Sequence, residues 1–168
     1  MAAEFLRHHL ELQGVEAVVR SAGTQGGVVD SDPDAIKVMA ELGLAIHDHL
    51  PRRVNRELLS TDGADLIITM TNAHLREVAL LSPDLFRRSF TAKEFVRRAL
   101  AVNQFDASEV GLGALLTRLS EGRSARDLLG DRVADDVDDP YGQGLAPHRR
   151  TAQELDEMMA TIARKLTL

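Results

Sequence analysis

The chain has 168 residues and a mass of 18.4 kDa, which suits one compact domain. Apolar residues make up 44% of it and charged residues 27%, and 20 basic against 26 acidic residues give a net charge of −6. This globular composition predicts an ordered chain over most of its length, and the acidic balance gives no electrostatic footprint for nucleic acid or an anionic membrane. There is no secretory signal and no apolar run of the roughly 18–20 residues that span a bilayer, so we expect a cytoplasmic protein.

The sequence contains no cysteine. This excludes a disulfide scaffold, thiolate zinc sites, iron–sulfur clusters and a cysteine nucleophile in the chain as written. His47-Asp48-His49 offers two imidazoles and a carboxylate, but no third ligand is identifiable, and we interpret it as a surface turn. We therefore expect neither a metal nor another cofactor.

The first third of the chain predicts a helix, a strand and a second helix. Apolar residues recur with helical spacing over residues 1–13. Residues 15–20 are rich in β-branched side chains and predict a strand, which leads into Ser21-Ala22-Gly23-Thr24. Asp32-Pro33 combines a helix cap with proline at the first helical position, and it predicts a helix that Gly43 ends.

The middle of the chain predicts two further strands, each followed by a helix. The apolar run over residues 65–70 suits a strand that is buried on both faces, as in a parallel sheet. A helix is predicted over 72–81, and a weaker strand over 86–90. Thr91-Ala92-Lys93-Glu94 has the form of a capping box for a helix that continues through Leu100.

The last third predicts a helix over 108–120 and a closing helix after a second capping box, Thr151 with Glu154. The alternation predicts an α/β fold of three layers, a parallel sheet with helices on both faces. Only three strands are found and the chain opens on a helix, so we expect the first strand to be missing. No linker divides the chain, and residues 1–168 are expected to form a single domain.

Residues 135–139 place four carboxylates in five positions, followed by Pro140-Tyr141-Gly142. Carboxylate oxygens suit a hard cation, although the spacing is not that of an EF-hand loop. Proline and glycine favour the simpler interpretation of a solvated acidic turn. Residue types alone leave the choice open.

Together and in order, these segments resemble the low-molecular-weight protein-tyrosine phosphatases. Residues 1–6 are similar to the family's first helix, 21–24 to the loop after its second strand, and 66–70 with Asn72 to its third strand. His49-Leu50-Pro51-Arg52 is similar to a His-x-Ala-Arg motif, with Pro51 as a departure. Residues 90–95 are similar to a stretch common in bacterial members, and 138–142 to the Asp-Pro-aromatic motif.

The resemblance implies roles for four residues. Asp139 is implied to be the general acid that protonates the leaving phenolate and then activates water. Tyr141 is implied to line the mouth of the site against the substrate's aromatic ring. Ser21 is implied to support the phosphate loop by a hydrogen bond, and His49 to be a further supporting residue. The implied substrate is a phosphotyrosine protein or a small aryl phosphate, with no nucleic-acid or membrane partner.

The chain departs from the family at its N-terminal end. It begins after the family's first strand and after the Cys-x5-Arg phosphate loop, which carries the nucleophile. General acid catalysis contributes about 10²–10⁴-fold and needs an attacking group, so the chain as written is expected to be inactive. Without the first strand, residues 15–20 and 66–70 are expected to lower stability as unpaired edges or to pair directly with each other.

This departure has two interpretations. The first is a phosphatase acting through a cysteinyl-phosphate, whose start is assigned here to an internal methionine. The alternative is a cysteine-less pseudo-phosphatase that serves as a binding or regulatory module. An arsenate reductase on the same fold also needs cysteines, and nothing in the sequence supports it.

Overall fold

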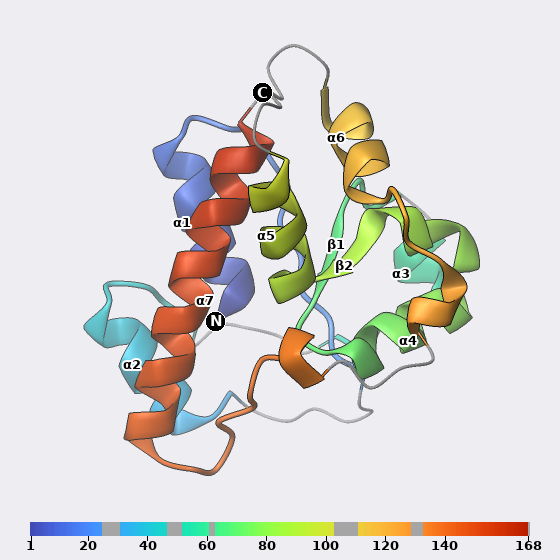
Figure 1. The fold of residues 1–168 in the computed structure, drawn as a ribbon. Helices are drawn as coiled ribbons and strands as arrows, with labels where there is room; N and C mark the ends of the chain where they lie inside the picture. The colour runs from blue at the N-terminus through green and yellow to red at the C-terminus, as the bar shows by residue number, and fades with distance from the viewer. Residues whose placement is uncertain (25–30, 47–51, 61–62, 103–110, 129–132, 168) are drawn as a thin grey trace. The chain divides into compact units, whose positions relative to one another are not determined.

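The computed structural model describes residues 1–24, 31–46, 52–60, 63–102, 111–128 and 133–167. The chain forms two compact units, which Figure 1 shows as ribbons. Unit 1 consists of Met1–Arg53 together with Asp138–Thr167, and unit 2 consists of Val54–Val137. The single domain expected over the whole chain stays a prediction.

Unit 1 is built on three helices, α1 (Ala2–Leu12), α2 (Pro33–Glu41) and α7 (Leu145–Leu166). The long helix α7 packs against both α1 and α2 (Figure 1). All three contribute apolar side chains to the buried core, among them Phe5, Leu10, Val38, Met39, Leu155, Met159 and Ile162. Burying each such side chain contributes about 1.5–3 kcal/mol to the free energy of folding. Helix α7 is central to this unit because it packs against both of the other helices.

The predicted start of α2 is confirmed in detail. The Asp32 carboxylate accepts a hydrogen bond from the Asp34 amide at 2.8 Å, and Pro33 occupies the first helical position. Gly43 follows the helix with a φ of +76°, a left-handed conformation that glycine adopts without steric cost. Local sequence chemistry therefore sets both ends of this helix.

The predicted start of α7 is wrong. The helix begins at Leu145 rather than at the Thr151 capping box, and Thr151 is buried inside it. Gly144, with a φ of +88°, precedes the first turn. Pro147 lies in that first turn. The N–H groups there have no partner within the helix, so a proline costs the helix no hydrogen bond.

Residues 15–20 form no strand, which corrects the prediction. They run without a ladder after α1, and 82% of the Val18 surface is exposed. In the described part of unit 1 the isolated β-bridge joins Gly23 to Arg53, outside this segment. β-branched residues favour a strand only when a neighbouring strand takes their backbone groups, and no described strand of unit 1 does so here.

Unit 2 contains a parallel pair of strands, β1 (Ile67–Thr69) and β2 (Ser89–Thr91). Ile68 lies opposite Phe90 in the register. The described helices of unit 2 are α3 (Arg56–Ser60), α4 (Asn72–Leu81), α5 (Ala92–Ala101) and α6 (Gly111–Leu119), with 3-10 turns at Pro83–Arg88, Ala125–Leu128 and Val133–Asp135. Because α4 connects the two strands, they run parallel. Helix α5 lies on one side of the strands and α4 on the other (Figure 1).

Most of the predicted elements of unit 2 are confirmed. Helix α4 has the predicted bounds, and α6 lies within the predicted helix, of which residues 108–110 fall outside the described part. The Thr91 hydroxyl accepts a hydrogen bond from the Glu94 amide at 3.1 Å, as the capping box predicted. The strand predicted over 86–90 is displaced, because Pro83 opens a 3-10 turn that continues to Arg88 and the strand begins only at Ser89.

A polar contact joins α1 to α7 within unit 1. His9 Nε2 lies 2.7 Å from Asp156 Oδ1, and both side chains are partly exposed. We expect a double-mutant cycle of His9→Ala and Asp156→Ala to give a coupling free energy of about 0.2–1 kcal/mol that shrinks in 1 M salt. Urea unfolding followed by circular dichroism measures it, and simple additivity of the two variants would contradict it.

Candidate functional site

The Asp-Pro-Tyr-Gly segment forms a tight turn in unit 1, directly before α7. Asp139 Oδ1 accepts a hydrogen bond from the Tyr141 amide at 3.1 Å. The Gln143 amide donates to the Pro140 carbonyl at 2.9 Å, and the Gln143 side chain donates to the Asp139 carbonyl at 2.7 Å. We call residues 139–144 the acid loop. Its backbone and side chains order the turn from within.

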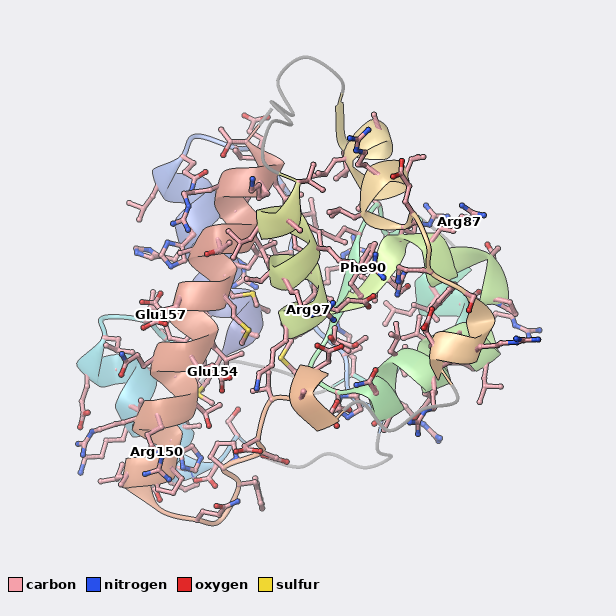
Figure 2. The ribbon with its side chains drawn as sticks, in the orientation of Figure 1. Arg87, Phe90, Arg97, Arg150, Glu154 and Glu157 are labelled. Carbon is pink, nitrogen blue, oxygen red and sulfur yellow. The ribbon has the colours of Figure 1, made fainter. Side chains whose placement is uncertain are left out.

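The acid loop presents both of its predicted functional side chains to solvent. Asp139 is exposed, and 60% of the Tyr141 surface is accessible. Asp139 also borders a pocket of about 260 Å³ beside the first two turns of α7. Its lining comprises Asp138, Asp139, Pro140, Gln143, Pro147, Arg150, Thr151 and Glu154. Figure 2 labels Arg150 and Glu154 on α7. An exposed carboxyl group at the edge of an open pocket can exchange a proton with a bound ligand.

Two residues outside the acid loop contact it within unit 1. Asp32 Oδ2 accepts a hydrogen bond from the Gly142 amide at 2.8 Å. His148 Nδ1 lies 2.8 Å from the Gly144 carbonyl, to which it donates because a carbonyl only accepts. The pKa of Asp32 is lowered, mainly by the hydrogen bond from Gly142 and next by the one from Asp34. The sequence interpretation assigned Asp32 to a helix cap alone and did not single out His148.

The structure does not assemble all four predicted site residues. Asp139 and Tyr141 lie together in one turn. Ser21 is half-buried in the segment before the Gly23–Arg53 bridge, and no described hydrogen bond joins it to the acid loop. His49 lies outside the described residues, together with the His47-Asp48-His49 turn. The roles implied for these four residues therefore stay predictions.

Of the carboxylates at 135–139, Asp138 and Asp139 are exposed to solvent, whereas Asp135 and Asp136 bind side chains of unit 2. Asp135 forms an ion pair with Arg97, with oxygen–nitrogen distances of 2.8 and 3.0 Å. Asp136 Oδ1 accepts hydrogen bonds from the Asn72 amide at 2.7 Å and from its side chain at 2.9 Å. These two carboxylates thus stabilise unit 2, at α5 and at the start of α4. No group of three potential metal-ligating side chains occurs among the described residues.

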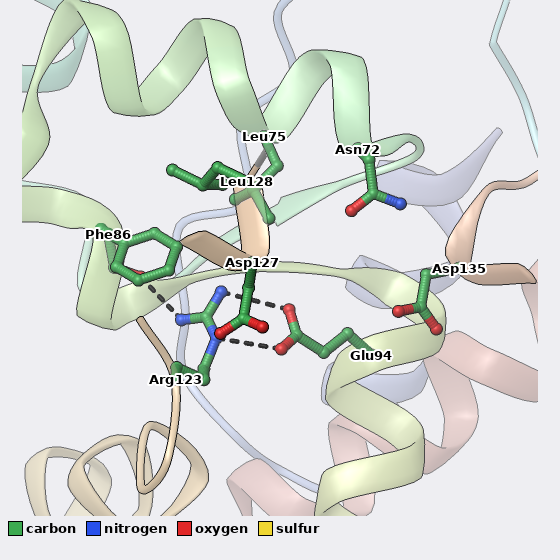
Figure 3. A pocket seen from close by; sticks show the side chains of 8 residues that line it. All are labelled: Asn72, Leu75, Phe86, Glu94, Arg123, Asp127, Leu128 and Asp135. Atoms are coloured by element: carbon green, nitrogen blue, oxygen red, sulfur yellow. Dashed lines mark hydrogen bonds and ion pairs between the residues drawn. The ribbon is translucent and has the colours of Figure 1, made fainter. Parts of the chain in front are cut away.

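Unit 2 contains a second pocket, which Figure 3 shows from close by. Its volume is about 10 Å³, room for no more than one water molecule. Arg123 lines the pocket; its side chain is 2% exposed and contacts Glu94 Oε1 at 2.9 Å. Burial lowers the pKa of Arg123, against the opposing effect of the Glu94 carboxylate. This pocket is part of the packing of unit 2 and is too small for a substrate.

The fold and the acid loop define the class to which this chain belongs. It is an α/β protein with a parallel sheet, and it carries an exposed Asp-Pro-Tyr turn before its last helix. The family model of the low molecular weight phosphotyrosine protein phosphatases matches residues 1–109. The chain belongs to this family of protein phosphatases, which confirms the predicted family.

One curated relative extends this likeness over nearly the whole chain, and another matches about half of it. Over 167 residues the chain is 25% identical to the protein-arginine-phosphatase of Bacillus subtilis strain 168, covering 99% of this chain and 87% of that one. It is 36% identical over 81 residues to the low molecular weight protein-tyrosine-phosphatase Wzb of Escherichia coli K12, covering 47% of this chain and 50% of that one.

Solved structures confirm the predicted fold class. A YwlE mutant from B. subtilis superposes with a TM-score of 0.70 at 23% identity, covering 99% of this chain and 88% of that one. A low molecular weight protein tyrosine phosphatase from T. tengcongensis gives 0.69 at 25% identity, covering 98% and 88%. The fold is thus the three-layer α/β fold of this family. Within the described residues, no helix combines the length and the apolar character needed to cross a membrane.

Proposed function

We propose that this chain is the greater part of a cysteine-dependent protein phosphatase, whose nucleophile and phosphate loop precede Met1 in the complete protein. The acid loop carries this proposal, because it keeps Asp139 ordered, exposed and next to Tyr141. A module that only binds has no need of an exposed acid in this place. Residues 15–20 add support, since a segment with the pattern of a strand has no ladder in the present chain.

The proposed reaction uses Asp139 twice. A thiolate from the preceding segment attacks phosphorus, and the bond from phosphorus to the leaving atom breaks as Asp139 gives that atom a proton. Asp139 then takes a proton from the water that attacks the cysteinyl-phosphate, which releases phosphate and the thiolate. The proposed reaction involves no metal or other cofactor, and we propose the bacterial cytoplasm as its location.

Two substrate classes fit the site. The exposed ring of Tyr141 can pack on the ring of a phosphotyrosine side chain or a small aryl phosphate. The pocket is lined by three carboxylates, those of Asp138, Asp139 and Glu154, against one arginine, Arg150. This acidic balance favours a cationic group instead, such as the guanidinium of phosphoarginine. The relative that covers 99% of this chain is named a protein-arginine-phosphatase, which supports this second class.

The endogenous protein tests the proposal. We expect an intact mass above 18.4 kDa, with a peptide upstream of Met1 that contains cysteine and arginine. We also expect hydrolysis of p-nitrophenyl phosphate that persists in EDTA and disappears after thiol alkylation. Phosphotyrosine and phosphoarginine peptides then separate the two substrate classes. A protein of 18.4 kDa that begins at Met1 and hydrolyses none of these substrates overturns the proposal and favours a binding module.

A further inference from the structure

The side chain of Asp32 joins two segments of unit 1 that lie 110 residues apart in the sequence. One carboxylate oxygen, Oδ1, accepts the Asp34 amide and caps α2. The other, Oδ2, accepts the Gly142 amide at 2.8 Å in the middle of the acid loop. A helix cap needs only one of these bonds. The second bond is therefore available for another purpose.

His148, on α7, lies next to the same contact. Its side chain is 1% exposed, and its Nε2 lies 3.5 Å from Asp32 Oδ2. Its Nδ1 donates to the Gly144 carbonyl. The imidazole thus lies between the end of the acid loop and the carboxylate that holds its middle. A nearly fully buried side chain that donates a hydrogen bond from Nδ1 keeps its ring in place beside the loop.

The acid loop needs such restraint because of its glycines. Gly142 and Gly144 have φ values of +69° and +88°. Glycine enters this region at no steric cost but leaves it as readily, so its own backbone does not select one conformation. The bonds within the loop involve residues 139–141 and 143, whereas the bonds from Asp32 and His148 fall on Gly142 and Gly144 themselves.

We propose that Asp32, supported by His148, is a positioning residue that holds the acid loop in the geometry required for proton transfer by Asp139. This inference rests on the proposed function, in which Asp139 is the acid. Gly142 follows Tyr141 directly and lies three residues after Asp139. Loss of the hydrogen bond from its amide to Asp32 therefore removes a restraint close to both of these side chains. A misplacement of about 1 Å can cost a reaction about 10²-fold in rate.

The charge of Asp32 suits this role. Hydrogen bonds from two backbone amides stabilise its carboxylate and keep its pKa below the ordinary value of 3.8. The group is therefore ionised throughout the neutral range, and its bond to Gly142 is a charge-assisted one, shorter and stronger than a neutral bond. The restraint thus persists at any pH at which the proposed phosphatase would work.

The chain offers an unusually simple probe of the acid loop, since Tyr141 is its only tyrosine. A sample labelled with 15N-tyrosine gives one backbone amide signal, and that signal reports on the loop. Asp32→Ser is the informative variant, because a serine hydroxyl still caps α2 but is too short to reach Gly142. Glu41→Gln is the matched control, a carboxylate on the same helix that bonds Arg149 of α7 and not the acid loop.

We expect the order parameter of the Tyr141 amide to fall from about 0.85 in the parent chain to below about 0.6 in Asp32→Ser, with no change in Glu41→Gln. Unchanged order in a folded Asp32→Ser chain overturns the inference and leaves Asp32 as a helix cap only. If Asp32→Ser fails to fold, Asp32→Asn serves instead. Its single oxygen can keep the cap while its amide group repels the Gly142 N–H, and the same fall in order is expected.

Kinetics of the complete protein separate this inference from the proposed function. Asp32→Ser is expected to lower kcat/KM more for phenyl phosphate than for p-nitrophenyl phosphate, because kcat/KM reports the step in which the leaving group departs and the poorer leaving group depends more on the acid. Equal losses on the two substrates overturn the positioning role. If the parent protein hydrolyses neither substrate, the proposed function fails, and the order parameter alone still decides whether Asp32 holds the loop.

Discussion

Replacing Arg123 by methionine is expected to lower the free energy of unfolding by about 3–5 kcal/mol, the range found when one partner of a buried ion pair is removed. The Arg123 guanidinium donates to both oxygens of Glu94 and to the carbonyls of Phe86 and Ser89, all at 2.7–3.1 Å. It also lies 4.2 Å from the centre of the Phe90 ring. Methionine keeps much of the apolar volume of the side chain. It removes the hydrogen-bond donor of the two carbonyls and one of the positive charges that balance the Glu94 carboxylate.

Urea unfolding of the 168-residue chain measures this effect. Arg97→Met is the matched control, because Arg97 pairs with Asp135 from an exposed position, and we expect it to cost about 1 kcal/mol or less. Adding Glu94→Gln to Arg123→Met should recover part of the loss, since the double variant no longer buries an under-compensated charge. A melting temperature for Arg123→Met within about 2 °C of the parent value would contradict the central place of this arginine.

Elements with local signals were predicted well from the sequence. Asp32 and Thr91 cap the helices that they were expected to cap, because a cap bonds an amide two or three residues away. The same rule failed at Thr151, since a threonine three residues before a glutamate also occurs by chance inside a helix. The signal that matters there is Gly144, whose left-handed φ fixes where α7 can begin.

The strand predicted over residues 15–20 failed for a different reason. β propensity measures how a side chain packs beside neighbouring strands, so it is not realised when no neighbour is present. The run at residues 65–70 became a strand because β2 pairs with its central residues, Ile67–Thr69.

The candidate site was predictable only in part. The Asp-Pro-Tyr-Gly motif located Asp139 and Tyr141 through family resemblance, and the structure places them in one turn. The bond from Gly142 to Asp32 and the bond from Asn72 to Asp136 span 110 and 64 residues. No local pattern marks such a bond. Arg123 was not singled out either, because a buried arginine has the same local sequence character as an exposed one.

Asp139→Asn in the complete protein is expected to reduce kcat for phenyl phosphate by about 10²–10⁴-fold, the usual contribution of a general acid. Asparagine has no proton to give at neutral pH, but its side-chain oxygen can still accept the Tyr141 amide, so the acid loop keeps its shape. The loss of kcat/KM should be much smaller for p-nitrophenyl phosphate than for phenyl phosphate, because kcat/KM reports the step in which the leaving group departs and nitrophenolate is stable enough to leave without a proton. Steady-state kinetics on a series of aryl phosphates should therefore show a steeper dependence on leaving-group acidity.

Asp138→Asn supplies the control for charge alone. It removes a carboxylate from the neighbouring exposed position, which lines the same pocket, while leaving the acid loop intact. We expect its kcat to stay near the parent value for every aryl phosphate, with any change confined to KM. If Asp138→Asn matched Asp139→Asn, the negative charge of the segment would matter rather than proton transfer by one residue. If neither variant changed kcat for phenyl phosphate, the proton would have to reach the leaving oxygen from elsewhere, and Asp139 would not be the acid.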